Sequence, residues 1–275
     1  MAGLFANIPV RIAEEIGFPN HGLGFRLIFK FIYFFSHKVV AISSAVQEFI
    51  CDLKEVSIDK VVVIYNPVSS PLASNSSSSG DSSLVESLIQ CKEKPFIFIT
   101  TCRLVTVKNL FFLIKVFNKF VNAEKNPNVF LWIIGDGPLS NQLKTFTYQL
   151  DIFDQVIFLG HQSDVFPFLK EADVFILPSS SEGFSISLVE AMLCKLVVVS
   201  TNVGGPSEIV SSGINGFLFN PTDEFQLFKF MGEVYYMDPV DKEKFGKAAH
   251  SRASQFSLNN YGNNLLRLYM NLLSQ

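Results

Sequence analysis

The sequence predicts an α/β protein, most of which is a doubly wound, Rossmann-like domain around a parallel sheet. Two observations lead to this prediction. Short runs of β-branched and aromatic residues recur along the C-terminal two thirds of the chain, and amphipathic stretches with helical periodicity separate most of them. Strands that alternate with helices form parallel sheets covered on both faces. Because ligands bind beyond the carboxyl ends of such strands, functional residues are expected in the loops there.

Six runs are the expected strands of this sheet. They cover residues 95–100, 129–135, 156–160, 174–178, 196–200 and 216–219. Helices are expected between most of them, for example over 108–123 and 187–195, because apolar residues recur there at helical spacing. A last helix is expected over 258–273, where it could pack back on the N-terminal part of the chain.

A smaller α/β crossover precedes the sheet. Residues 37–65 predict a strand, a helix and a second strand. Ser43 or Ser44 stands where the helix should begin, and serine is a preferred N-cap residue. This segment therefore has the pattern of part of a Rossmann-like domain.

The composition changes after this crossover to a serine-rich segment with little apolar content, which is typical of a flexible linker. We place the domain boundary in this segment. The expected parts are a partial N-terminal domain over 1–67, a linker over 68–93 and a complete C-terminal domain over 94–275.

The composition also limits the partners of this protein. Its 275 residues carry a net charge of −3, so they create no general basic field for nucleic acid. The four cysteines lie far apart, without the paired spacing of zinc sites or disulfide frameworks. The first residues lack the basic and then apolar pattern of a signal peptide. Together these features favour a cytoplasmic protein with a small or lipid-linked partner.

Residues 23–42 form the most apolar stretch of the chain. Arg26, Lys30 and Lys38 interrupt it, so it does not have the uninterrupted apolar length of a transmembrane helix. Residues 25–35 could instead contact the cytoplasmic face of a membrane, with the cations near headgroups and the phenylalanines buried. An ordinary core helix is the alternative that the pattern favours more.

The loop after the first strand of the large sheet carries Arg103 and Lys108 just before a helix. A guanidinium can donate two parallel hydrogen bonds to phosphate oxygens, and an ammonium adds a point charge. The pair could therefore hold a diphosphate and offset its charge as a leaving group. Taken alone, the same spacing fits two solvated loop charges equally well.

The segment SSSEGFSISLVEAM, which follows the fourth of these strands, is the strongest functional signal in the chain. Glu182 lies in its loop, and Gly183 would let the backbone come close to a ligand. Ser185 or Ser187 could cap the helix that carries Glu190. Two carboxylates placed in this way can accept hydrogen bonds from the hydroxyls of two different sugars, while the helix N-terminus favours an anion. A loop charge and a solvated helix residue are the less favoured alternative.

Two further loops contain paired glycines. Gly135 and Gly137 in GDGP could bring the backbone close to a nucleotide base or ribose. Gly204 and Gly205 in GGPSE precede another short helix, a geometry suited to phosphate. An ordinary turn and a plain helix start explain these loops almost equally well.

His161 also stands at a strand end, in the sequence LGHQSDV. A single histidine without a paired carboxylate is more often structural, so His161 is not assigned a catalytic role.

Taken in order, these motifs resemble glycosyltransferase family 4, the group 1 transferases of GT-B fold. The resemblance runs from Arg103 and Lys108 through GDGP, the Glu182 segment and GGPSE to the GINGFLF strand with its NPTD turn. An ordered set of this kind is far more specific than any one member. The earlier segments VAISSAVQEFI and KVVVIYNPV resemble the end of that family's N-terminal domain.

The resemblance implies an enzyme that transfers a sugar from a UDP- or GDP-sugar to a glycan or lipid-linked acceptor with retention of anomeric configuration. Arg103 and Lys108 would hold the diphosphate, Glu190 the ribose hydroxyls, and Glu182 the sugar near the reacting carbon. Arg103, Lys108 and Glu182 are thus the expected catalytic residues, and neither a metal nor another cofactor is expected. The expected donor-binding residues are Arg103, Lys108, Gly135, Gly137, Gly183, Phe184, Ser185, Glu190, Gly204 and Gly205. Polysaccharide biosynthesis is the usual setting of such enzymes.

Two departures from the family pattern matter. Ser185 stands where the family often has glycine, a mild change that keeps the capping ability. The sequence also begins where a family member is most of the way through its N-terminal domain, so we expect a truncated domain that a partner chain could complete. Two complete Rossmann-like domains need roughly 300–400 residues.

Two other functions stay open from the sequence. Donor-site residues beside an incomplete acceptor half would also suit a catalytically inactive nucleotide-sugar-binding remnant, or one subunit of a split transferase. A sugar-nucleotide epimerase of similar fold ranks lower, because it would need acid and base groups from the N-terminal half.

Overall fold

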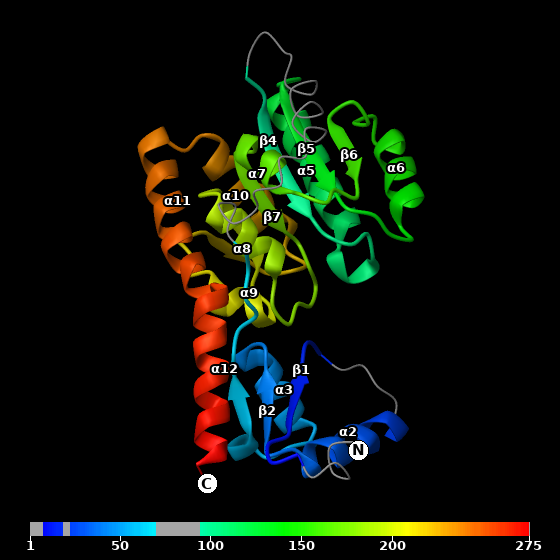
Figure 1. Ribbon diagram of the computed structural model, residues 1–275. Coiled ribbons are helices and arrows are strands. Elements are labelled where there is room, and N and C mark those ends of the chain that lie inside the picture. The colour runs from blue at the N-terminus through cyan, green and yellow to red at the C-terminus, as the bar shows by residue number, and fades with distance from the viewer. Residues whose placement is uncertain (1–7, 19–22, 70–93, 275) are drawn as a thin grey trace.

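The structure is a computed structural model that describes residues 8–18, 23–69 and 94–274 and contains two parallel sheets (Figure 1). A three-stranded sheet belongs to the N-terminal part, which we call the small unit, and a six-stranded sheet belongs to the C-terminal part, the large unit. Most of the predicted linker lies outside the described residues.

All six predicted strands of the large unit form. They are β4 (Phe96–Thr101), β5 (Val129–Ile134), β6 (Val156–Gly160), β7 (Val174–Leu177), β8 (Val197–Thr201) and β9 (Phe217–Phe219). Every neighbouring pair is parallel, in the order β6-β5-β4-β7-β8-β9. The helices of this unit are α5 (Leu110–Glu124), α6 (Ser140–Gln149), α7 (Phe166–Glu171), α8 (Ile186–Leu193), α9 (Gly204–Ile209), α10 (Glu224–Tyr235), α11 (Pro239–Ala253) and α12 (Leu258–Leu273).

Both faces of the large sheet are covered, which explains why its strands consist mostly of apolar residues. On β4, Phe98 packs in one hydrophobic cluster with residues of α5 and α10, whereas Ile97 and Ile99 belong to a second cluster with residues of α8. The second cluster continues into the small unit through Val39 and Val46. The doubly wound prediction is confirmed.

The strand order places a topological switch point between β4 and β7. The chain builds β5 and β6 on one side of β4 and then returns to place β7, β8 and β9 on the other side. Connections that leave β4 and β7 in opposite directions open a crevice at the carboxyl ends of these strands. This crevice is where the loops with the candidate residues meet.

The small unit contains one strand more than the sequence predicted. Its sheet has the order β1-β2-β3, formed by β1 (Ile12–Glu15), β2 (Lys38–Ala41) and β3 (Val61–Val63). β1 has the sequence IAEE, which lacks apolar alternation, so only its parallel pairing with β2 identifies it. The Tyr33 hydroxyl, which donates a 2.6 Å hydrogen bond to Glu15 Oε2, helps to hold it there.

Two helices accompany this small sheet, α2 (Leu23–Phe35) and α3 (Ser44–Asp52). Ser43 is the N-cap of α3, since its Oγ accepts a hydrogen bond from the Val46 amide at 3.1 Å. Helix α12 leaves the large unit and runs beside the small sheet, where residues of α12 and β3 line a shared groove (Figure 1).

Helix α2 exposes most of its apolar surface. Among its described side chains only Tyr33 is buried, so α2 is not the core helix that the pattern favoured. Exposed large apolar residues on this helix are Phe25, Leu27, Ile28, Phe31, Ile32 and Phe34. In the part of the chain that the structure describes, no helix is long and apolar enough to cross a membrane.

Candidate functional site

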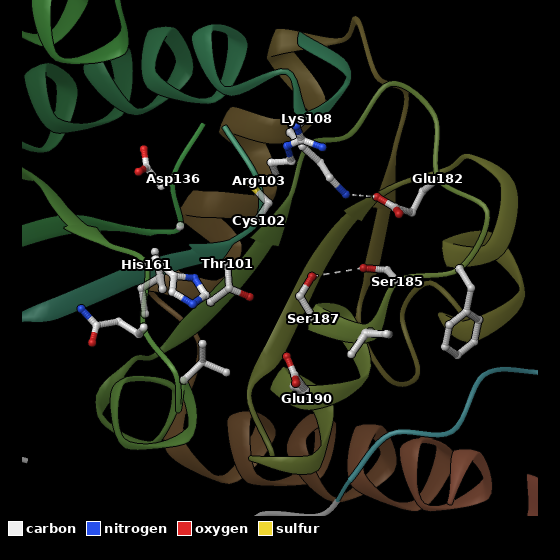
Figure 2. A pocket seen from close by; sticks show the side chains of 16 residues that line it. Thr101, Cys102, Arg103, Lys108, Asp136, His161, Glu182, Ser185, Ser187 and Glu190 are labelled. Carbon is white, nitrogen blue, oxygen red and sulfur yellow. Dashed lines mark hydrogen bonds and ion pairs between the residues drawn. The ribbon is translucent and has the colours of Figure 1, made fainter. Parts of the chain in front are cut away.

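A cavity of about 790 Å³ lies at the carboxyl ends of β4, β5, β6 and β7, at the switch point of the large sheet. Its walls come from the loops after these four strands and from the start of α8 (Figure 2). Lining residues are Thr101, Cys102, Arg103, Lys108, Ile134, Gly135, Asp136, His161, Gln162, Val165, Glu182, Phe184, Ser185, Ile186, Ser187 and Glu190.

The loop after β4 brings its two cations to one side of this cavity. Lys108 ends a single 3-10 turn, and Asn109 then takes a left-handed conformation with φ 54° before α5 begins. The Lys108 Nζ lies 2.5 Å from Glu182 Oε2, with side chains 18% and 14% exposed respectively. Arg103 is exposed and lies beside Lys108 (Figure 2). The predicted cation pair thus faces one cavity together with the first predicted carboxylate.

The start of α8 forms another wall. Ser185 is its N-cap and accepts a hydrogen bond from the Leu188 amide at 3.3 Å, and its Oγ lies 3.3 Å from Ser187 Oγ. Glu190 follows one turn later and also lines the cavity. Figure 2 shows the two serines between Glu182 and Glu190, so the carboxylates occupy different parts of the same wall.

Burial gives Glu190 an unusual electrostatic position. Desolvation raises the pKa of its carboxyl group above the ordinary value, and the negative charge of Asp164 raises it further. Among the described residues no hydrogen-bond donor contacts the Glu190 carboxylate, so nothing there offsets the desolvation of its ionised form. Hydroxyl groups of a bound ligand could supply such donors. Burial likewise raises the pKa of Cys102 in the same cavity to about 11, so this thiol stays neutral at physiological pH.

The glycines of GDGP bring two loops of the site into backbone contact. Gly135 has φ +130°, and a Cβ built on it would lie 1.9 Å from the Cys102 carbonyl oxygen. A Cβ on Gly137 would lie 2.5 Å from the Leu104 carbonyl oxygen. Gly135 lines the cavity, whereas Gly137 lies outside its lining. These glycines thus support the loop that carries Arg103.

The glycines of GGPSE support the loop over residues 180–185, which we call the Glu182 loop. Gly204 has φ +42°, and a Cβ on it would lie 2.1 Å from the Glu182 carbonyl oxygen. A Cβ on Gly205 would lie 2.3 Å from the Gly183 carbonyl oxygen, and the Gly205 amide donates to the Glu182 carbonyl at 3.0 Å. Neither glycine lines the cavity. In this structure both glycines approach the backbone of the Glu182 loop.

Gly183 is also outside the cavity lining. A Cβ on this residue would lie 3.1 Å from Gly17 Cα and 3.3 Å from Val46 Cγ2, both in the small unit. The cavity therefore unites only part of the predicted donor-binding set. The members that line it are Arg103, Lys108, Gly135, Phe184, Ser185 and Glu190, together with the predicted catalytic Glu182.

The cavity also contains residues to which the sequence assigned no functional role. His161 and Gln162 come from the loop after β6, and Thr101 ends β4. Figure 2 shows the His161 ring near Thr101. The side-chain oxygen of Thr101 is buried without a hydrogen-bond partner among the described residues. The position of His161 at a strand end was the available signal, because that sheet edge is where ligands bind.

No group of three or more His, Cys, Asp or Glu side chains is arranged to hold a metal ion in the described ranges. Cys51, Cys102 and Cys194 are free thiols. The positive charge that faces the cavity comes from Arg103 and Lys108.

The order of these motifs along the doubly wound sheet also marks a protein family. The family described as glycosyl transferases group 1 matches residues 89–251, more than half of the chain. This chain belongs to that family. The matched region includes every strand of the large sheet and all the residues that line the cavity.

Individual relatives agree with this assignment. The chain is 29% identical over 239 residues to the Escherichia coli UDP-Gal:alpha-D-GlcNAc-diphosphoundecaprenol alpha-1,3-galactosyltransferase, covering 80% of this chain and 60% of the relative. It is 34% identical over 126 residues to the Bacillus anthracis N-acetyl-alpha-D-glucosaminyl L-malate synthase, covering 46% of this chain and 32% of that enzyme. The chain thus spans 60% of the length of the first relative and less of the second.

Solved structures share the fold. Anabaena HepE in complex with UDP superimposes with a TM-score of 0.83 at 24% identity, covering 98% of this chain and 74% of HepE. Staphylococcus aureus TarM superimposes with a TM-score of 0.75 at 18% identity, covering 97% of this chain and 51% of TarM. The fold is therefore of the GT-B type.

Proposed function

We propose that this protein binds a nucleotide-diphosphate sugar in the cavity and transfers its sugar to a glycan or lipid-linked acceptor with retention of anomeric configuration. The observation that carries the proposal is the meeting of Arg103, Lys108, Glu182 and Glu190 in one cavity at the switch point. Cations suit a diphosphate, and carboxylates suit sugar hydroxyls. We assign the chain to glycosyltransferase family 4 within the group 1 transferases on the same motifs.

The proposed reaction uses the charge on these side chains. The bond between the anomeric carbon and the β-phosphate oxygen breaks, and the acceptor hydroxyl oxygen bonds to that carbon from the same face. The hydroxyl proton passes to the leaving phosphate oxygen. Arg103 and Lys108 offset the charge that develops on the leaving diphosphate, and electrostatic stabilisation of this kind is usually the largest single contribution to catalysis. Glu182 holds the sugar, and Glu190 holds the ribose.

The names of similar proteins suggest the substrate class. The Escherichia coli relative is named for transfer from UDP-Gal to a diphosphoundecaprenol-linked sugar. HepE has been solved with UDP and with UDP-glucose. By likeness we propose a UDP-sugar ahead of a GDP-sugar, and a lipid-linked acceptor in polysaccharide biosynthesis.

A lipid-linked acceptor would place this protein at a membrane, and α2 offers a surface for that contact. Its exposed face carries large apolar side chains, including Phe31 and Phe34, and Lys30 is exposed beside them. Aromatic residues with flanking cations suit the interface of an anionic bilayer. We propose peripheral contact on the cytoplasmic face through residues 25–35. Vesicle co-sedimentation should weaken in Phe31→Ser and Phe34→Ser, and unchanged sedimentation would reject this contact.

The edge of the small sheet allows a second arrangement. In the described residues β1 pairs on one side only, with β2. An unpaired strand edge accepts a further strand. A partner chain that adds strands here could supply acceptor contacts, as one subunit of a split transferase would need.

Calorimetric titration with UDP, GDP and their sugars tests the donor site. Binding of one nucleotide should weaken in both Arg103→Ala and Glu190→Ala. Lys115→Ala is the matched control, because Lys115 is an exposed cation paired with Glu224 outside the cavity. Absence of binding in the wild-type protein would reject the proposal.

Turnover with membrane or glycan acceptors separates the remaining functions. Release of nucleoside diphosphate that requires an acceptor supports the transferase. Tight binding without turnover, with and without candidate partner chains, would favour a nucleotide-sugar-binding module. Conversion of the donor to its epimer without an acceptor would favour an epimerase.

A further inference from the structure

Glu208 on α9 connects the two units by capping a helix of the other unit. Its Oε1 accepts a hydrogen bond from the Ala45 amide at 2.8 Å, and its Oε2 accepts one from the Ser44 amide at 3.0 Å. These amides are the first two of α3, and the third, Val46, is capped by Ser43. A carboxylate at a helix N-terminus satisfies free N–H groups and interacts favourably with the helix dipole.

The same carboxylate holds a residue that follows β3. The Tyr65 hydroxyl donates a hydrogen bond to Glu208 Oε2 at 2.8 Å. Burial raises the pKa of Tyr65 most, and this hydrogen bond raises it further. The Tyr65 ring lies 6.0 Å from the Phe184 ring and 5.4 Å from the Phe256 ring. Arg252 donates to the Glu208 carbonyl at 2.8 Å. Glu208 is therefore held from both units.

The Glu182 loop lies between the elements that Glu208 joins. On one side, Gly204 and Gly205 at the start of α9 pack against its backbone. On the other side, Val46 of α3 lies close to Gly183. Phe184 of the same loop packs against Tyr65. Displacement of α3 would remove the packing of Val46 against the loop that carries Glu182, which faces the cavity.

We infer that Glu208 is a positioning residue that fixes the small unit against the Glu182 loop and so sets the geometry of Glu182 during sugar transfer. It does not line the cavity, so it acts through the loop and not on the donor. The catalytic part of this inference rests on the proposed function; the positional part rests on the contacts of Glu208 alone.

The test uses Glu208→Gln in the full chain. Glutamine has nearly the same shape as glutamate. Its NH2 group, however, would face an amide or hydroxyl donor whose hydrogen bond the carboxylate accepts in the wild type. Hydrogen exchange should accelerate in peptides that cover residues 43–48 and 180–188. Turnover should fall about 10- to 100-fold through kcat, the loss expected when a hydrogen bond to a charged group is broken, while donor affinity and KM stay near wild type.

Two further variants complete the test. Glu224→Gln is the matched control, since Glu224 is an exposed carboxylate whose ion pairs to Lys115 and Lys119 stay within the large unit; neither readout should change. Tyr65→Phe removes one hydrogen bond and leaves both amide contacts of Glu208, so its effects should have the same pattern and be smaller. It also provides the test if Glu208→Gln fails to fold.

The outcomes separate this inference from the proposed function. Unchanged exchange over 180–188 in Glu208→Gln would overturn the inference even if the wild type is an active transferase. Equal losses of donor affinity and turnover would also overturn it, because they would indicate general damage. A wild type without nucleotide binding would defeat the proposed function and the kcat prediction, and the exchange measurement would still decide the positional part.

Discussion

Two glycine pairs in the large unit look equivalent in the sequence and differ in their surroundings. Gly135 of the GDGP pair lines the cavity, and a side chain at this position would also clash with the Cys102 carbonyl. Gly204 and Gly205 lie behind the cavity wall, against the backbone of the Glu182 loop. A glycine pair therefore indicates a close approach without identifying what approaches. We propose that the side chains that line the cavity between these loops carry the ligand chemistry.

Substitution behind the cavity wall should have the largest effect. Gly204→Ala would place a Cβ 2.1 Å from the Glu182 carbonyl oxygen at a positive φ. We expect the free energy of unfolding, measured in urea, to fall by about 2–4 kcal/mol. Neither the strain of a positive φ nor the clash with the carbonyl oxygen can relax unless the backbone moves.

Gly232→Ala is the control for this change. Nothing lies within 4 Å of a Cβ at Gly232, which is within α10. The control should be neutral or stabilising by about 0.5–1 kcal/mol through helix propensity. Equal free energies of unfolding for both variants would show that the close contact of Gly204 with the Glu182 carbonyl does not require glycine.

Substitution at the cavity surface should affect binding with less effect on folding. Lys108→Met removes the cation nearest Glu182, and we expect the dissociation constant for a nucleoside diphosphate to rise about 10- to 100-fold, as for loss of a charge-assisted hydrogen bond. Lys119→Met removes an exposed cation outside the cavity and should leave the constant unchanged. Equal binding by both variants in calorimetry would refute the diphosphate role of Lys108.

Glu190→Gln should have a smaller, pH-dependent effect on stability. Burial raises the pKa of Glu190 in the folded protein, so the folded state binds the proton more tightly than the unfolded state. Stability from this group is then present at low pH and is lost as pH rises through the folded pKa. Glu190→Gln should remove this loss, so its free energy of unfolding relative to wild type should increase with pH. A constant difference across the acidic range would contradict the shift.

Metal removal should have the smallest effect. Arg103 and Lys108 supply the positive charge that faces the cavity, and we propose that they offset the diphosphate charge during transfer. Turnover measured with a chelator should therefore equal turnover without it. A loss that added magnesium or manganese restores would show that the cations need a metal partner.

The predictable and unpredictable parts of the fold differ in how local their signals are. Each strand of the large sheet consists mostly of apolar residues, because both faces of the sheet are covered, and such runs are visible in the sequence. β1 has no such run and exists through its pairing with β2. Helix α2 has the apolar content of a core helix, yet most of its described side chains are exposed. Burial depends on neighbours that local pattern does not encode.

The candidate site divides in the same way. Arg103, Lys108, Glu182 and Glu190 were predictable because their residue types stand at strand ends and a helix start, where a parallel sheet places its ligand. His161 occupies an equivalent position and was set aside because it has no carboxylate partner in the sequence. Its place in the cavity depends on β6 lying beside β5, a non-local contact.

The sequence by itself determined the family, the strand-and-helix alternation and the candidate residues Arg103, Lys108, Glu182 and Glu190, because these depend on local pattern and motif order. The tertiary structure alone decided that Glu208 caps α3, that Gly204 and Gly205 support the Glu182 loop, and that α2 is exposed. The reason is physical. Each of these features is a contact, or the lack of one, between segments far apart in the chain, and a side chain carries no local mark of which distant backbone it will meet.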